Sequence, residues 1–183
     1  MNILAISGSL RADSYSTQLL HTAAGLTKLQ LWNGLATVPP FNEDHEETPA
    51  QAVHAMRAEV AAADALLIAT PEYNTTIPGQ LKNALDWMSR PYLEGVLVDK
   101  PVAVVGVSPS DYGADWAQND LRKVLKVCGA QVVERHLCIP RADSAFDGDG
   151  RLRDKTAQAT LALVLDDLGA LVNERNERKV VLA

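Results

Sequence analysis

Short apolar runs alternate along the chain with segments in which apolar residues recur at helical spacing. The apolar runs occupy Ile3–Ser7, Leu29–Trp32, Ala65–Thr70, residues 101–108, and a last region at 131–133 and 137–139. The helical segments cover residues 14–24, 50–63, 78–88, 115–128 and 152–172, and the polar tail at 173–179 is expected to fray. Strands that alternate with helices in this way predict an α/β fold, in which a parallel sheet carries helices on both faces.

Three loops that follow predicted strands are rich in glycine, proline and hydroxyl residues. They cover residues 8–13, 71–78 and 108–114. Ligands of open parallel sheets bind outside the carboxyl ends of the strands, at the point where the strand order reverses. We therefore expect these three loops to form the ligand site.

The first of these loops combines hydroxyl groups with one guanidinium group. Ser9, Ser14 and Ser16 supply the hydroxyls and Arg11 the positive charge, and the loop leads directly from a strand into a helix. Backbone N–H groups at such a turn point toward one place, which suits a phosphate monoester. The alternative is an ordinary turn in which a serine caps the helix and the arginine is solvated. Two further loops rich in the same residue types are expected at the same edge of the sheet, which favours the interpretation as a phosphate site.

The composition narrows the range of partners. A formal charge of -6 and a pI near 5.2 argue against binding to nucleic acid, which requires a basic face. No apolar run reaches the length of a membrane span, and the N-terminus lacks the basic segment of a signal peptide. We expect a cytoplasmic protein without membrane contact, folded as a single domain over residues 1–183.

Cysteine and histidine give no sign of a metal site. Cys128 and Cys138 lie in apolar runs without a CxxC spacing and are expected to be reduced core residues. The histidines are scattered, without the short spacings of a zinc site, so no metal is expected. Residues 33–49 form a long loop, which indicates a lid or an interface, and its acidic run at 43–47 is interpreted as a solvated face.

Two stretches resemble a known family, whereas the fingerprints GxxxxGK[ST] and GxGxxG do not occur. One stretch is Gly8-Ser9-Leu10-Arg11-x-x-Ser14, and the other is Pro71-Glu72-Tyr73-Asn74-x-x-x-Pro78-Gly79-x-Leu81-Lys82-Asn83-x-x-Asp86-Trp87-x-Ser89-Arg90. They resemble the NADPH-dependent FMN reductase family, which includes flavodoxin-like quinone, chromate and azo-dye reductases. The resemblance extends over residues 1–129. It implies a flavodoxin-like three-layer sandwich with a five-stranded parallel sheet in the order 2-1-3-4-5, and homodimers or homotetramers.

The resemblance also implies roles for individual residues. It assigns the FMN phosphate to Ser9, Arg11, Ser14 and Ser16, where Ser16 stands in place of a frequent asparagine. It places the isoalloxazine ring against Pro71, Glu72, Tyr73 and Asn74, with Ser108 beside it. Lys82, Asn83, Asp86 and Arg90 are interpreted as helix-surface or subunit-contact residues, and Trp87 as a core or interface residue. In the third loop Ala114 and Trp116 replace a glycine and an arginine that many relatives carry.

The function implied is an FMN-dependent NAD(P)H oxidoreductase. NADPH or NADH would supply hydride to the flavin, and a quinone, a free flavin, an azo compound or an oxidised metal would accept the electrons. No residue is assigned as catalytic, because the reactivity belongs to the flavin. Two alternatives remain. The chain could be a non-enzymatic, flavodoxin-type electron carrier or a flavin-dependent partner-binding protein, which docks a basic redox partner through residues 43–47. Alternatively, FMN could be a released substrate.

Overall fold

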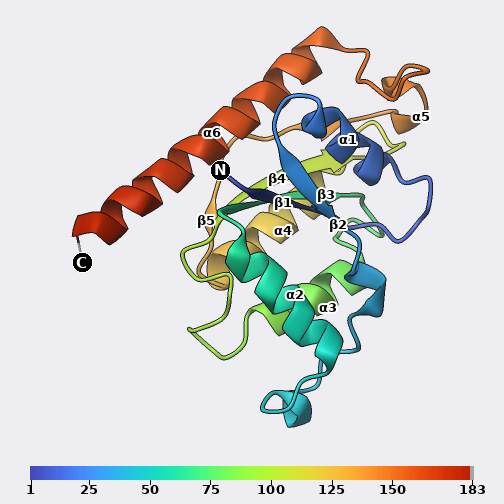
Figure 1. Ribbon diagram of the computed structural model, residues 1–183. Coiled ribbons are helices and arrows are strands. Elements are labelled where there is room, and N and C mark those ends of the chain that lie inside the picture. Colours follow the sequence, from blue (N-terminus) through green and yellow to red (C-terminus); the bar gives the residue numbers. More distant parts are fainter. Residues whose placement is uncertain (182–183) are drawn as a thin grey trace.

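A parallel β-sheet forms the centre of the computed structural model, which describes residues 1–181 (Figure 1). The strands are β1 (Ile3–Ser7), β2 (Leu29–Trp32), β3 (Ala65–Thr70), β4 (Pro101–Val107), β5 (Gln131–Val132) and β6 (Cys138–Ile139). They lie in the order β2-β1-β3-β4-β5, with β6 also paired to β4, and every pair is parallel. The predicted strand order is confirmed. The last strand region, predicted at 131–133 and 137–139, consists of the two short strands β5 and β6.

Helices cover both faces of the sheet (Figure 1). One face carries α1 (Tyr15–Ala24), the short α5 (Ala142–Ala145) and α6 (Lys155–Val181), and the other carries α2 (Gln51–Ala62), α3 (Gly79–Met88) and α4 (Asp115–Val127). Alternation along a strand sends Ile3 and Ala5 into the first layer, and Leu4 and Ile6 into the second. The flavodoxin-like three-layer sandwich is thereby confirmed.

The carboxyl-terminal helix differs from the expectation. α6 begins at Lys155 rather than Leu152 and continues through the polar residues 173–179, so the prediction that this tail frays is wrong. Charged contacts hold it. Arg175 donates to the Asp64 carbonyl at 3.2 Å, and Arg178 pairs with the Asp99 carboxylate at 2.8 Å. Within residues 1–181 no helix combines the length and the hydropathy that a membrane crossing requires.

The long loop at residues 33–49 is tied to α3. It contains two short 3-10 turns, Leu35–Thr37 and Glu43–His45. Asn83 accepts from the Phe41 N–H at 2.7 Å and donates to the Pro39 carbonyl at 2.9 Å, and the Trp87 indole donates to the same carbonyl. These contacts give no support to the hypothesis of a lid, and they show that Asn83 anchors the loop to α3.

One ionisable group of the fold, Lys100, is almost fully buried. Only 2% of it is exposed, and its ammonium group donates to the Ala63 carbonyl at 2.6 Å. Burial, together with the positive charges of Arg175 and Lys179, lowers the pKa of Lys100 to about 8. The folded chain therefore releases this proton more readily than the unfolded chain does.

Stability is expected to rise with pH above pH 8 because of Lys100. Between its folded pKa of about 8 and its ordinary value of 10.5, the unfolded chain binds the proton that the folded chain has lost, so the free energy of unfolding increases with pH. The gain is roughly 1–3 kcal/mol. Urea unfolding of the wild type and of Lys100→Met at both ends of this range measures it. Equal rises in the two proteins would show that Lys100 is not the cause.

Candidate functional site

The candidate site lies at the carboxyl edge of the sheet, where the loops after β1, β3 and β4 meet. These strands are neighbours in the sheet, and the strand order reverses at β1 and β3. The Gly8 N–H donates to the Ala69 carbonyl at 2.8 Å, which continues the pairing of β1 with β3 into the first loop. The first and second loops therefore begin side by side at the reversal point, where such sheets bind ligands.

The turn between β1 and α1 gathers three buried hydroxyl groups. Ser9, Ser14 and Ser16 are 8%, 6% and 1% exposed. The Ser9 hydroxyl accepts from the Arg11 N–H at 3.2 Å, and the Ser14 hydroxyl caps α1 by accepting from the Ser16 N–H at 3.2 Å. The alternative interpretation of a serine cap is thus correct for Ser14. Each of these hydroxyls still has an O–H to donate to an anion.

Ser16 and Arg11 are the groups of this turn with hydrogen-bonding capacity to spare. The buried Ser16 hydroxyl has no hydrogen-bond partner among the described residues, which is unusual for a buried polar atom. The exposed Arg11 guanidinium donates to the Asp13 carbonyl at 3.1 Å and lies 5.9 Å from the centre of the Tyr15 ring. The Tyr15 hydroxyl donates to Asp143 at 2.6 Å, which raises the pKa of Tyr15.

Ser14→Ala is expected to destabilise the fold, because it removes the helix cap. The loss in the free energy of unfolding is about 1 kcal/mol. Ser16→Ala is expected to leave it nearly unchanged, since the Ser16 hydroxyl makes no hydrogen bond within residues 1–181. Urea unfolding of the two variants under identical conditions makes the comparison. An equal loss in both would contradict the assignment of Ser14 as the cap.

The second loop forms a tight turn beside the first. Tyr73 and Thr76 exchange two backbone hydrogen bonds, and Asn74 and Thr75 between them have positive φ angles of 51° and 63°. A depression of about 350 Å³ joins the two loops, and its lining residues are Gly8, Leu10, Arg11, Tyr73, Pro78, Gly79 and Gln80. The exposed Tyr73 ring thus lies in the same depression as Arg11.

Glu72 holds the second loop to the third, a role that the sequence did not predict. Its carboxylate accepts from the Ala117 N–H at 3.1 Å, in the first turn of α4. One residue of the same loop, Thr76, donates its hydroxyl to Asp120 at 2.6 Å. A carboxylate is favourable at the positive end of a helix. Glu72 is therefore a positioning residue for the loop rather than a free side chain beside the ligand.

The third loop is held against β6. Ser108 is buried, and its hydroxyl lies 3.1 Å from the Ser110 hydroxyl. Gly113 has a φ of 59°, and a Cβ there would lie 2.7 Å from the Ile139 nitrogen, so only glycine fits. Of the predicted site residues, only Arg11 of the first loop and Tyr73 of the second line this depression. The others do not line it, namely Ser9, Ser14, Ser16, Pro71, Glu72, Asn74 and Ser108.

Another part of the third loop presents an aromatic surface. The centroids of the Tyr112 and Trp116 rings lie 4.5 Å apart, and both side chains are exposed. Trp116 directly precedes Ala117, whose N–H binds the Glu72 carboxylate. The aromatic pair therefore stands next to the second loop.

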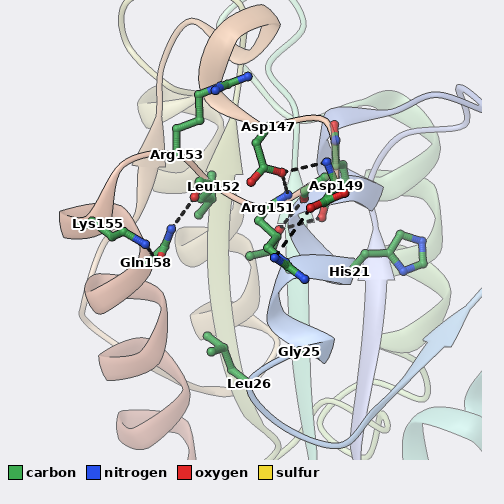
Figure 2. Close-up of a pocket in the computed structure, with 13 residues that line it drawn as sticks. His21, Gly25, Leu26, Asp147, Asp149, Arg151, Leu152, Arg153, Lys155 and Gln158 are labelled. Carbon is green, nitrogen blue, oxygen red and sulfur yellow. Dashed lines mark hydrogen bonds and ion pairs between the residues drawn. The ribbon is translucent and has the colours of Figure 1, made fainter.

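A larger cavity lies away from these loops. It measures about 840 Å³ and runs between α1 and the segment 147–158, as Figure 2 shows. Its charged groups already have partners. Asp147 accepts from the backbone N–H groups of Asp149 and Arg151, and the Arg151 guanidinium lies 3.8 Å from the Asp149 carboxylate. Size alone does not make this cavity the functional site.

The residues at the β1–α1 turn fit the phosphate of FMN. A buried hydroxyl without a partner, two further hydroxyls with free O–H groups, and an exposed guanidinium are the donors that a phosphate monoester requires. They stand at the amino end of α1, which favours an anion. The adjoining depression between the first two loops can take part of a flat ring system beside Tyr73.

Comparisons with known proteins point to one family. The model of the family described as NADPH-dependent FMN reductase matches residues 1–144. A 2-hydroxy-1,4-benzoquinone reductase of Burkholderia sp. is 33% identical over 179 residues, which cover 96% of this chain and 98% of that protein. An NAD(P)H-dependent FMN reductase of Pseudomonas aeruginosa is 39% identical over 173 residues, 92% of this chain and 93% of that protein.

A solved structure agrees as well. FerB, a flavoenzyme NAD(P)H:(acceptor) oxidoreductase from Paracoccus denitrificans, superposes with a TM-score of 0.84 at 29% identity and covers 95% of this chain and 98% of its own. The matches confirm the predicted oxidoreductase class and the predicted use of FMN with NAD(P)H. The family inferred from the motifs at residues 8–14 and 71–90 is thus the correct one: the chain belongs to the NADPH-dependent FMN reductases.

Proposed function

We propose that this chain holds one FMN across the loops after β1, β3 and β4 and uses it to reduce a quinone. When bound, FMN accepts hydride from NADPH or NADH and delivers the electrons to the acceptor. The observation that carries the proposal is the buried Ser16 hydroxyl, which has no partner among the described residues and shares the β1–α1 turn with the buried Ser9 and Ser14. Free flavins, azo compounds and oxidised metals are further acceptors in the same class.

The residues of the chain bind and orient the flavin. Ser9, Ser14 and Ser16 donate O–H groups to the phosphate, and Arg11 closes over it from the solvent side. The turn at Asn74 and Thr75, together with Pro71 and Ser108, would hold the ring system of the flavin.

The same loops provide the surface that the electron donor and the electron acceptor approach. Glu72 holds the second loop in place through the Ala117 N–H. The exposed rings of Tyr73, Tyr112 and Trp116 give flat apolar surface to a planar acceptor.

Anaerobic titration of the purified protein tests the proposal. A yellow protein with one FMN per chain, bleached by NADPH or NADH and restored to yellow by a benzoquinone, is the expected result. A protein that neither carries nor quenches added FMN would overturn it. FMN that binds but is lost on gel filtration would favour the alternative in which flavin is a released substrate.

The electron-carrier alternative has weaker support. It relies on residues 43–47 to dock a basic partner. Two carboxylates of this run already face Arg90, at 2.9 Å from Glu43 and 3.7 Å from Glu46. A carrier would exchange electrons rapidly with a reductase and be reduced slowly by NAD(P)H, whereas an enzyme is reduced rapidly. Stopped-flow reduction separates the two.

A homodimer, which can pair into a homotetramer, is part of the proposal. A groove of about 420 Å³ between α3 and α4 is bordered by apolar side chains that are largely exposed, Tyr92, Leu93 and Val127. Exposed apolar surface of this kind is typical of protein interfaces.

Both cysteines are free thiols, which suits a reducing cytoplasm.

Val127→Lys is expected to shift the protein toward monomer, because it places a charge among the exposed apolar side chains of this groove. Val180 is about equally exposed on α6, so Val180→Lys serves as the matched control. Light scattering after gel filtration measures the mass of each variant. A dimer that persists unchanged in Val127→Lys would place the interface elsewhere.

A further inference from the structure

Three side chains of different chemistry converge beside the amino end of α4. Asp115 is the first residue of α4, His136 lies between β5 and β6, and Cys138 is the first residue of β6. The Cys138 sulfur lies 3.6 Å from Asp115 Oδ1, and His136 Nδ1 lies 3.7 Å from the same oxygen. The three potential ligand atoms all lie within 4.8 Å of one another.

We propose that Asp115, His136 and Cys138 form a zinc-binding site. Tetrahedral zinc bonds of about 2.0–2.3 Å separate neighbouring ligand atoms by roughly 3.3–3.5 Å. Two of the three separations, those of 3.6 and 3.7 Å from Asp115 Oδ1, lie within a few tenths of an ångström of that range, and the third is at most 4.8 Å. A thiolate together with an imidazole selects zinc over magnesium or calcium. The sequence gives no sign of this site, because its histidines lack the close spacings typical of zinc sites and the three side chains come from distant positions.

Three protein ligands leave one tetrahedral position for water. The Asp115 and His136 side chains are 46% and 40% exposed, so solvent reaches the site and a metal ion can enter from it. On binding, the Cys138 S–H bond breaks, its proton goes to solvent, and a sulfur–zinc bond forms. Burial raises the pKa of the Cys138 thiol, so the metal rather than the protein has to drive this loss.

A buried amide supports the sulfur ligand. Gln118 is fully buried, and its Nε2 donates to the Cys138 sulfur at 3.1 Å. This contact holds the sulfur in place and favours its thiolate form. Gly106 in β4 makes room for the amide, because a Cβ there would lie 2.5 Å from the Gln118 nitrogen.

Arg122 fixes the backbone that carries the imidazole. Its guanidinium donates to the Arg135 carbonyl at 2.9 Å, one residue before His136. Its positive charge opposes the binding of a cation. The carboxylate of Asp115 and the thiolate of Cys138 together supply two negative charges, which exceed this one positive charge.

Protection of the cysteines against alkylation tests the site in the full chain with its flavin. Zinc ion is added, the protein is treated with iodoacetamide, and each cysteine is quantified by mass spectrometry. Zinc is expected to slow the alkylation of Cys138 by at least about tenfold, since the reactive thiolate becomes a metal ligand. Cys128 is the internal control, because it is also half-buried and has no metal-ligand cluster around it within residues 1–181.

Variants show whether the other two ligands take part. Asp115→Asn and His136→Ala are each expected to abolish the protection of Cys138, and Glu134→Gln, a change to a nearby exposed carboxylate, is expected to keep it. Zinc content after dialysis should be one ion per chain in the wild type and near zero in Cys138→Ser. Equal protection of both cysteines, or protection that survives Asp115→Asn and His136→Ala, would overturn the proposal. The test does not depend on flavin reduction.

Discussion

Arg11→Ala is expected to weaken FMN binding by about 10- to 100-fold. The guanidinium donates only to the Asp13 carbonyl within residues 1–181 and has no carboxylate partner there, so its charge is available to a phosphate. A charge-assisted hydrogen bond of this kind contributes roughly 1.5–3 kcal/mol. The dissociation constant, measured by quenching of FMN fluorescence, should rise by the corresponding factor.

Two variants separate the causes of this loss. Arg11→Lys keeps the charge but lacks the planar fork, and it should fall between the wild type and Arg11→Ala. Arg141→Ala is the matched control, because Arg141 is also exposed at this edge but is paired with Asp111 at 2.7 Å. It should bind FMN like the wild type. Unchanged affinity in Arg11→Ala would contradict the assignment of the phosphate to the β1–α1 turn.

The sheet and the location of the site could be predicted because they depend on local pattern. A strand buried on both faces, such as β3, has no polar residue until Thr70, and the turn residues after it are equally plain in the sequence. The family motif then related the strands to a known order. The periodicity of apolar residues and the position of turn residues are properties of neighbouring residues, so they can be recognised without the tertiary structure.

The roles of several polar motif residues could not be predicted in this way. Asn83 binds a loop more than forty residues earlier in the chain, and Glu72 binds the first turn of a helix forty-five residues later. Such partners are backbone groups, which are the same for every residue type. Side-chain identity therefore shows that a partner exists without showing which one it is.

The prediction that the α6 tail frays failed for a related reason. Residues 173–179 look solvated by composition, and their helical conformation depends on Asp64 and Asp99 from distant loops. The convergence of Asp115, His136 and Cys138 is equally a product of topology, because the pairing of β4 with β6 places Cys138 beside the helix that follows β4.

Arg122 fills a gap in the sheet between β5 and β6. β4 pairs with β5 up to Val132 and with β6 from Cys138, and the segment between them does not pair as a strand. The buried Arg122 guanidinium occupies that gap. It donates to the Val104 carbonyl of β4 at 2.9 Å, and to the carbonyls of Val133 and Arg135 in the segment. Burial lowers the pKa of Arg122, which reflects the cost of placing a charge there.

Arg122→Met is expected to lower the free energy of unfolding by roughly 3–5 kcal/mol. Methionine matches the length of the side chain but leaves three carbonyls without a donor, at about 1–3 kcal/mol for each one that stays buried. Relief of the buried charge offsets part of this cost. Urea unfolding measures the loss, and Lys123→Met, an exposed change at the next position of α4, should cost less than about 0.5 kcal/mol. Arg122→Lys keeps a positive charge but cannot reach all three carbonyls at once, so it should also be clearly destabilised. If Arg122→Met were as stable as Lys123→Met, water would have to satisfy the three carbonyls, and the guanidinium would not be what closes the sheet.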